Sequence, residues 1–154
     1  MRVTDDKSRR DAAEHLALAL TQSGMQRMAA RVLAAFLFTD EPSLTAGDVA
    51  KQLDASAGSL SGAIKLLDAL GMVERVPVPS SRSEHFRMRA EPWADLYSKQ
   101  NTVIDLILQS TDRGIAAVDD GPARQRLEHM RDFYTFMLSE IPALLERFEA
   151  RRAK

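Results

Sequence analysis

The chain has 154 residues, of which 45% are hydrophobic and 28% charged, and this size and balance fit one globular domain with a real core. It has no cysteine, which excludes a disulfide framework, a thiolate metal site and a cysteine nucleophile and fits a reducing cytoplasm. The net charge of −1 excludes a molecule that is basic as a whole, although a local positive face would suffice for phosphate contacts. The polar first ten residues and the lack of a long apolar segment predict a cytoplasmic protein that has no membrane partner.

Hydrophobic periodicity predicts two helices before residue 40. Residues 11–22 carry apolar side chains at helical spacing, including Leu16 and Leu20, and residues 25–38 carry a second apolar stripe. A turn around Pro42 follows, because proline cannot continue a helix. Thr45 then begins a third helix, with Asp48 three residues later as in a capping box.

A fourth helix follows a turn that is too short to hold another element. Ser56 is placed to cap it, and its apolar residues form one stripe. The opposite face is small or hydroxylic except for one lysine, and consists of Ala57, Gly58, Ser59, Ser61, Gly62 and Lys65. Each glycine costs about 1 kcal/mol of helix propensity relative to alanine. Two glycines on one exposed face therefore predict the close approach of something bulky.

A β-hairpin is predicted after the fourth helix, with strands over 73–78 and 84–88. Pro77 and Pro79 restrict the first strand to the edge of the sheet, because proline cannot donate a ladder hydrogen bond. The loop between the strands, residues 80–83, is polar and carries Arg82 at its tip. Helix, tight turn, helix and hairpin together predict a winged helix-turn-helix.

Two long helices are predicted between residues 92 and 150, the first of them over 93–109. In the second, apolar residues alternate spacings of three and four: Leu127, Met130, Tyr134, Met137, Ile141, Leu144 and Phe148. A seam of three heptads is typical of paired helices. The chain is thus expected to be mainly α, a single domain over 1–154. Its parts are N-terminal helices (11–38), a winged helix-turn-helix with a small hairpin wing (44–90) and C-terminal dimerisation helices (92–150).

The third and fourth helices and the wing supply the candidate DNA contacts. Major-groove binding needs a short helix whose exposed face reaches base edges and carries donors near its start. Lys65 is placed to meet a phosphate, and Arg75 and Arg87 flank the wing. The candidates are Thr45, Ser56, Ala57, Gly58, Ser59, Ser61, Gly62, Lys65, Arg75, Arg82 and Arg87. The alternative, a solvated helix with a small polar face, is less favoured because a capped helix precedes it and a hairpin follows.

The run from Ala46 to Arg75 resembles the winged-helix core of MarR-type transcriptional regulators, including the GbsR-like branch. The matching segments are 45–50 with Leu53, 56–61, and 70–75 with Leu67. Residues 24–32 are similar to the helix that leads into the motif in that branch. The order of elements is also similar to that of MarR-type regulators, because helices precede the winged unit and follow it.

This resemblance implies a homodimer on a pseudo-palindromic operator in double-stranded DNA, most often acting as a repressor. The first and last helices would intertwine, through Leu16, Leu20 and the seam residues, and Arg82 would reach the minor groove. It also implies a pocket for a small apolar or aromatic effector, with the aromatic candidates Phe36, Phe86, Trp93, Tyr97, Phe133 and Tyr134. The alternative for these aromatics is ordinary core and dimer packing.

The rival function is a winged-helix adaptor that binds protein and not specific DNA. The nearly balanced charge of residues 24–90, eight basic against seven acidic side chains, permits it. Catalysis and metal binding are not expected. His15, His85 and His129 fall on three different elements without ligand spacing. No phosphate loop, nucleophile elbow or zinc motif is present, so no cofactor is predicted.

Overall fold

The computed structural model describes residues 3–154, with the side chains of 5–98 and 101–154. It forms two compact units that meet in sequence at Pro92. The first holds helices α1 (Val3–Gln22), α2 (Arg27–Phe38), α3 (Ala46–Leu53) and α4 (Ala57–Ala69) with strands β1 (Leu44–Thr45), β2 (Val73–Val76) and β3 (His85–Met88). The second holds α5 (Pro92–Ala117) and α6 (Pro122–Arg152). The boundary coincides with the predicted start of the C-terminal helices, and a single domain stays a prediction.

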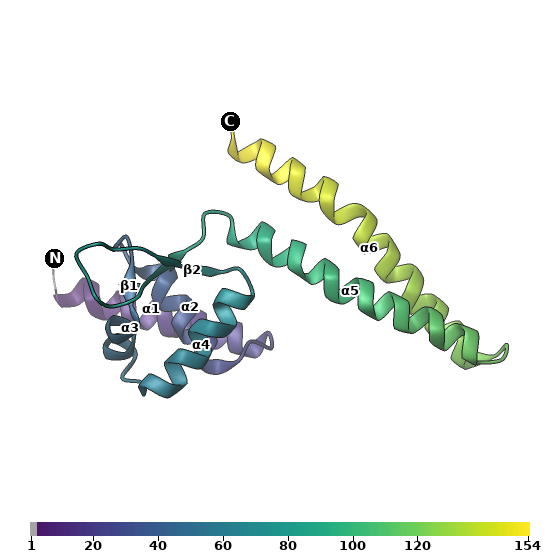
Figure 1. Ribbon diagram of the computed structural model, residues 1–154, viewed down its shortest axis with the longest axis horizontal. Coiled ribbons are helices and arrows are strands. Elements are labelled where there is room, and N and C mark those ends of the chain that lie inside the picture. The colour runs from purple at the N-terminus through teal and green to yellow at the C-terminus, as the bar shows by residue number, and fades with distance from the viewer. Residues whose placement is uncertain (1–2) are drawn as a thin grey trace. The chain divides into compact units, whose positions relative to one another are not determined.

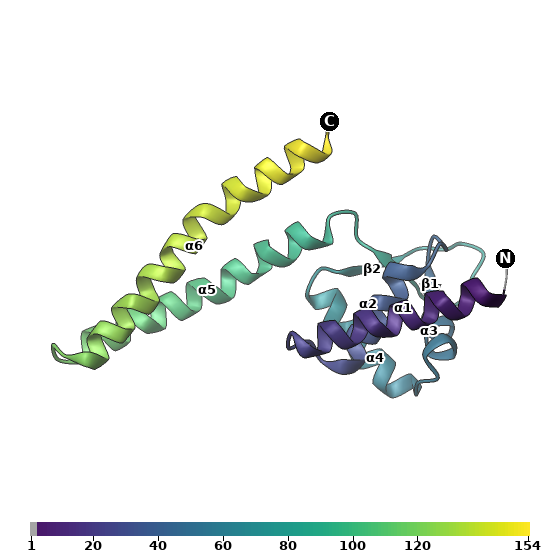
Figure 2. The same ribbon diagram turned by 180° about the vertical axis from the view of Figure 1, so that it is seen from behind.

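Helix α2 is the centre of the first unit. It packs against α1, α3, α4 and β3, and Figure 2 shows α1 crossing it. Seven of its residues are buried. Leu33 is fully buried, as are Leu60 and Leu67 of α4 and Val73 of β2, and these residues belong to the core. Alanines let α1 approach closely, because Ala17, Ala30 and Ala34 are buried together. The expected winged helix-turn-helix is confirmed (Figure 1).

The sheet has the strand order β1-β3-β2, all antiparallel. Strand β2 lies at the edge of the sheet, as Pro77 and Pro79 after it predict. It ends at Val76 because Pro77 has no N–H to donate. The short strand β1 was not predicted. It pairs Leu44 with Phe86 and thereby fixes the start of α3 against the wing.

Two helix bounds differ from the prediction. Helix α1 begins at Val3, eight residues earlier than predicted. The sequence does not show this start, because residues 5–10 are exposed and polar and have no apolar period. Asp5 and Asp6 in the first turn favour that start through the helix dipole. Helix α5 runs to Ala117 instead of residue 109. Gly114 faces the Leu127 side chain of α6, where a Cβ would lie 3.4 Å from Cδ1.

Helices α5 and α6 form the second unit. They lie side by side near the turn that joins them and diverge toward their other ends in both views (Figures 1 and 2). Pro92 stands at the first position of α5, as expected, and Pro122 at the first of α6. Between the open ends lies a cleft of about 510 Å³, lined by Trp93 and Tyr97 of α5 and by Leu144 and Phe148 of α6, among others.

Candidate nucleic-acid interface

Reciprocal hydrogen bonds fix the start of α3. The Asp48 N–H donates to Thr45 Oγ1 at 3.0 Å, and the Thr45 N–H donates to Asp48 Oδ2 at 2.9 Å. This is the predicted capping box, with aspartate in the place of the usual glutamate. Helix α3 ends at Leu53, and the next residue, Asp54, has a left-handed φ of 50°. Ser56 caps α4 two residues later. The turn between the helices is thus set by local side-chain chemistry.

The capping box gives a pH prediction. The Thr45 backbone N–H, and then its hydroxyl, lower the pKa of Asp48, and nearby His85 and Lys51 add to this. A carboxylate whose pKa is lower in the folded state stabilises the fold fully above the unfolded pKa and loses that effect as pH falls through the folded value. Asp48 is exposed, so solvent screens its interactions and the effect is small. We expect Asp48→Asn, measured by urea unfolding, to lose roughly 0.3 kcal/mol less than the wild type between pH 5 and pH 2. Parallel pH curves for the two proteins would contradict this role.

The exposed face of α4 has the composition that the sequence predicts. Leu60, Ala63, Ile64 and Leu67 are buried, and every candidate contact on the helix is exposed. A Cβ built at Gly58 or Gly62 meets no atom within 4 Å, and neither residue has a positive φ. Neither conformation nor packing in this chain therefore requires glycine at these positions. They leave room for something outside the chain.

Two serine hydroxyls at the start of α4 form a hydrogen bond with each other. Ser56 Oγ and Ser59 Oγ are 2.9 Å apart, and Ser56 Oγ also accepts from the Ser59 N–H at 3.4 Å. Both residues are exposed, so each hydroxyl keeps capacity for an external partner. The N-terminus of α4 also presents free backbone N–H groups, which favour a phosphate.

A shallow hollow of about 440 Å³ joins the start of α3, the exposed side of α4 and the sheet. It brings together four of the predicted contacts, Thr45, Ser61, Lys65 and Arg75. Asp68 and Glu84 also line it, so its charge is balanced. The hollow is therefore a polar surface of mixed charge, which agrees with the near-neutral composition of this part of the chain.

Ion pairs occupy two of the predicted wing arginines. Arg75 Nη2 lies 3.1 Å from Glu84 Oε1, and Arg87 Nε lies 2.9 Å from Glu74 Oε1. Arg89, which the sequence reasoning missed, also reaches Glu74, and hydrogen bonds from Arg87 and Arg89 lower the pKa of that carboxyl. Finding these pairs requires the strand register, which sets Glu74 opposite Arg87. Exposed pairs contribute about 0–1 kcal/mol, so a phosphate could replace either carboxylate.

Arg82 is exposed at the tip of the wing. Within the described part of the chain it takes part in no ion pair. The structure thus leaves Lys65 and Arg82 as the predicted basic contacts that no neighbouring carboxylate holds.

The effector candidates lie in both units of the structure. Phe36 and Phe86 are buried in the first unit, and Trp93 and Tyr97 line the cleft of the second. Phe133 and Tyr134 make an edge-to-face pair, with ring centres 5.3 Å apart on α6. Because Phe36 and Phe86 are buried, they fit the alternative interpretation, in which these aromatics are ordinary core residues.

The residues of the predicted seam on α6 form two stripes that differ in exposure. Leu127 and Tyr134 are half-buried in the single chain, and Ile141 is buried there, so their own chain covers Ile141 and part of the other two. Met130, Met137, Leu144 and Phe148 are exposed, the last two at 55% and 47%, and Phe133 joins them at 54%. On α1, Leu20 packs on the α1–α2 alanine cluster and Leu16 is half-buried. The surface left for a partner is therefore the exposed stripe.

Among the described residues, no group of three or more His, Asp or Glu side chains could hold a metal ion. Nor is any described helix long and apolar enough to cross a membrane.

Comparison with known proteins gives consistent results. A model of the MarR family matches residues 23–82, and a model described as MmpR5-like MarR family transcriptional regulator matches residues 91–151. The chain is 28% identical over 129 residues to the HTH-type transcriptional regulator MmpR5 of Mycobacterium tuberculosis, covering 82% of this chain and 78% of that one. A crystal structure of a transcriptional regulator superposes with a TM-score of 0.82 at 25% identity, covering 93% and 99% of the two chains.

Proposed function

The chain belongs to the MarR family and is a DNA-binding transcriptional regulator, and we propose that it acts as a homodimer on a pseudo-palindromic operator. The MarR-type resemblance is confirmed, and neither matching model names the GbsR-like branch. The relatives are regulators of transcription and not enzymes, and they do not favour the adaptor alternative.

The observation that carries the DNA contact is the open face of α4. It combines two glycines that the fold does not need, a capped N-terminus and Lys65. A helix without side chains at Gly58 and Gly62 can lie close to base edges in the major groove. Arg82 at the wing tip would contact the neighbouring minor groove. Because the chain lacks a high density of positive charge, its DNA affinity would come mainly from close contacts and from the N-terminus of α4.

The exposed stripe of α6 supports the homodimer. An apolar patch of this kind marks an interaction surface, and in the proposed dimer the same stripe of a second copy covers it. Two winged units would then bind half-sites about 10 base pairs apart. The regulator would act in the cytoplasm, most simply as a repressor that occupies the operator, and a small effector would release it. A few kcal/mol of difference in affinity between two dimer geometries would suffice.

Salt dependence tests the roles of the two basic residues. We expect Lys65→Ala and Arg82→Ala each to weaken operator binding roughly tenfold and to reduce the slope of log K against log salt by about one per copy, hence two per dimer. Titrations by fluorescence anisotropy at several salt concentrations measure both quantities. Lys7→Ala, which removes an exposed lysine on α1, is the matched control. Unchanged slopes in both variants would remove these two residues from the interface.

A further inference from the structure

The ion pairs of the wing lie on opposite faces of strands β2 and β3. Neighbouring residues of a strand point to opposite faces, so Glu74 and Arg75 face different ways. The register places Arg75 across from the buried Phe86. Arg75 and Glu84 line the hollow beside α4, whereas Glu74 and its partners do not. The Arg75–Glu84 pair therefore occupies the face of the wing that is turned toward α4.

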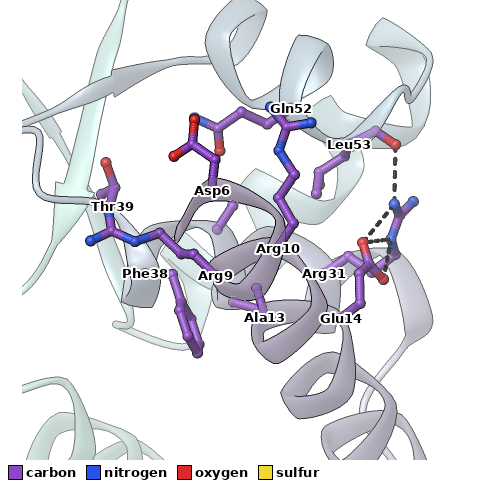
Figure 3. A pocket seen from close by; sticks show the side chains of 12 residues that line it. Asp6, Arg9, Arg10, Ala13, Glu14, Arg31, Phe38, Thr39, Gln52 and Leu53 are labelled. Carbon is purple, nitrogen blue, oxygen red and sulfur yellow. Dashed lines mark hydrogen bonds and ion pairs between the residues drawn. The ribbon is translucent and has the colours of Figure 1, made fainter. Parts of the chain in front are cut away.

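The Arg75–Glu84 pair is exposed and is not part of the core. Its two side chains are 68% and 59% exposed, and Arg75 Nη2 lies 3.1 Å from Glu84 Oε1. The pair of Arg31 with Glu14 differs, because Arg31 is only 23% exposed and also donates to the Leu53 carbonyl at 3.1 Å (Figure 3). Arg31 thus holds the fold together. An exposed pair such as Arg75–Glu84 adds little to stability, so we looked for its role in DNA binding.

The charged side chains that line the hollow beside α4 balance each other. Lys65 and Arg75 are positive, and Asp68 and Glu84 are negative. A DNA phosphate that replaces Glu84 on Arg75 exchanges one anion for another, and the displaced carboxylate stays near the phosphate and repels it. Arg75 therefore adds little to the charge-driven attraction of DNA. That attraction supplies essentially all of the affinity for non-specific sequences.

We propose that Glu84 is a specificity-determining residue. It keeps Arg75 from DNA phosphates, and it thereby lowers the affinity for non-operator DNA more than the affinity for the operator. This role rests on the proposed function, because it presupposes that α4 reads an operator.

The two kinds of complex differ in what fixes the protein on the duplex. On non-operator DNA, α4 makes no base contacts that set its register, so the protein settles where it gains the most phosphate contacts, and a free arginine adds one. On the operator, base contacts set the register, and Lys65 and the N-terminus of α4 meet the phosphates within reach. Arg75 then stays paired with Glu84, and the carboxylate costs little affinity.

Such a device suits a regulator whose recognition helix has a small, weakly charged face. Non-operator sites in a genome number about 10⁶–10⁹, so the ratio of the two affinities decides occupancy of the operator. A free arginine on the wing would strengthen non-operator binding by a larger factor than operator binding. Glu84 prevents this loss of specificity.

Glu84→Gln tests the role by anisotropy titration of the protein with two duplexes at several salt concentrations. The first is the duplex recovered by selection from a random pool, and the second has the same base composition in shuffled order. On the shuffled duplex we expect the affinity to rise about tenfold at low salt. The slope of log K against log salt should steepen by about one per copy, because Arg75 gains a phosphate. On the selected duplex the affinity should rise by no more than about twofold.

Asp68→Asn is the matched control. Asp68 lines the same hollow, and in the described part of the chain it belongs to no ion pair. The substitution removes the same charge but releases no arginine, so both affinities should rise equally, by about twofold. The double variant Glu84→Gln, Arg75→Gln has the net charge of the wild type. Its affinity for the shuffled duplex should return to the wild-type value.

Three results would overturn the role of Glu84. They are equal gains of Glu84→Gln on the two duplexes, a gain on the shuffled duplex no larger than that of Asp68→Asn, and a double variant that keeps the gain. Because both side chains of the pair are exposed, the substitutions leave the core intact, and thermal unfolding checks this. A wild type that binds the two duplexes equally would overturn the proposed function and this role together. That failure shows in the wild type alone, so it is distinguishable from a failure of Glu84 only.

Discussion

Replacing Leu144 by aspartate is expected to turn the proposed dimer into a monomer and to lower operator affinity by at least about a hundredfold. Leu144 is 55% exposed in the single chain, so the substitution costs the monomer little, but it buries a charge in the proposed interface. Separate winged units lose the avidity of two linked half-sites, which is typically worth a factor of 10²–10⁴. Sedimentation velocity and anisotropy titration with operator DNA measure the two effects.

Ser139→Asp is the matched control for this experiment. It adds the same charge to α6 at an exposed position five residues away, about 140° around the helix from Leu144. It should remain dimeric and bind DNA as the wild type does. Ile141 would be an unsuitable target, because it is 8% exposed and a charge there would disturb the chain's own packing. A wild-type monomer, or a dimeric Leu144→Asp variant, would contradict the pairing through this stripe.

The double variant Gly58→Ala, Gly62→Ala is expected to be more stable and a weaker DNA binder. Each alanine gains about 0.5–1 kcal/mol of helix stability, since the new Cβ has open space and a helical φ. On DNA the two methyl groups would enter the gap between α4 and the base edges. We expect operator affinity to fall by roughly ten- to a hundredfold, because a displacement of about one ångström disturbs every contact of the helix.

Thermal unfolding and anisotropy titration on the same preparation test this pair of effects. The opposite signs act as an internal control, because a misfolded variant cannot gain stability while it loses binding. A stabilised variant with unchanged DNA affinity would show that this face of α4 does not meet DNA closely.

Local features of the fold could be predicted from the sequence. The Thr45–Asp48 and Ser56 caps and the 3.6-residue apolar stripe of α4 depend on neighbours within four residues, and all appear in the structure. The start of α1 could not be predicted, because exposed polar turns leave no periodic signal. Strand β1 is two residues long, too short for alternation, and exists only because β3 lies beside it.

Features that depend on distant partners were the ones missed. The α6 seam reads as one interface in sequence, yet Ile141 is covered by its own chain and Leu144 is not. Spacing cannot tell a partner in the same chain from one in a second copy. The Glu74 pairs depend on strand register. The hydrogen bonds from Arg31 to Glu14 and to the Leu53 carbonyl join residues that are far apart in sequence and carry no shared motif.

Selection of bound duplexes from a random DNA pool by the protein tests the central claim most directly. We predict enrichment of one sequence whose two halves are related by a two-fold axis and separated by about 10 base pairs. Both halves should be needed for full affinity. A pool that shows no preferred sequence after repeated rounds, although the protein is folded, would contradict the assignment of a sequence-specific dimeric regulator.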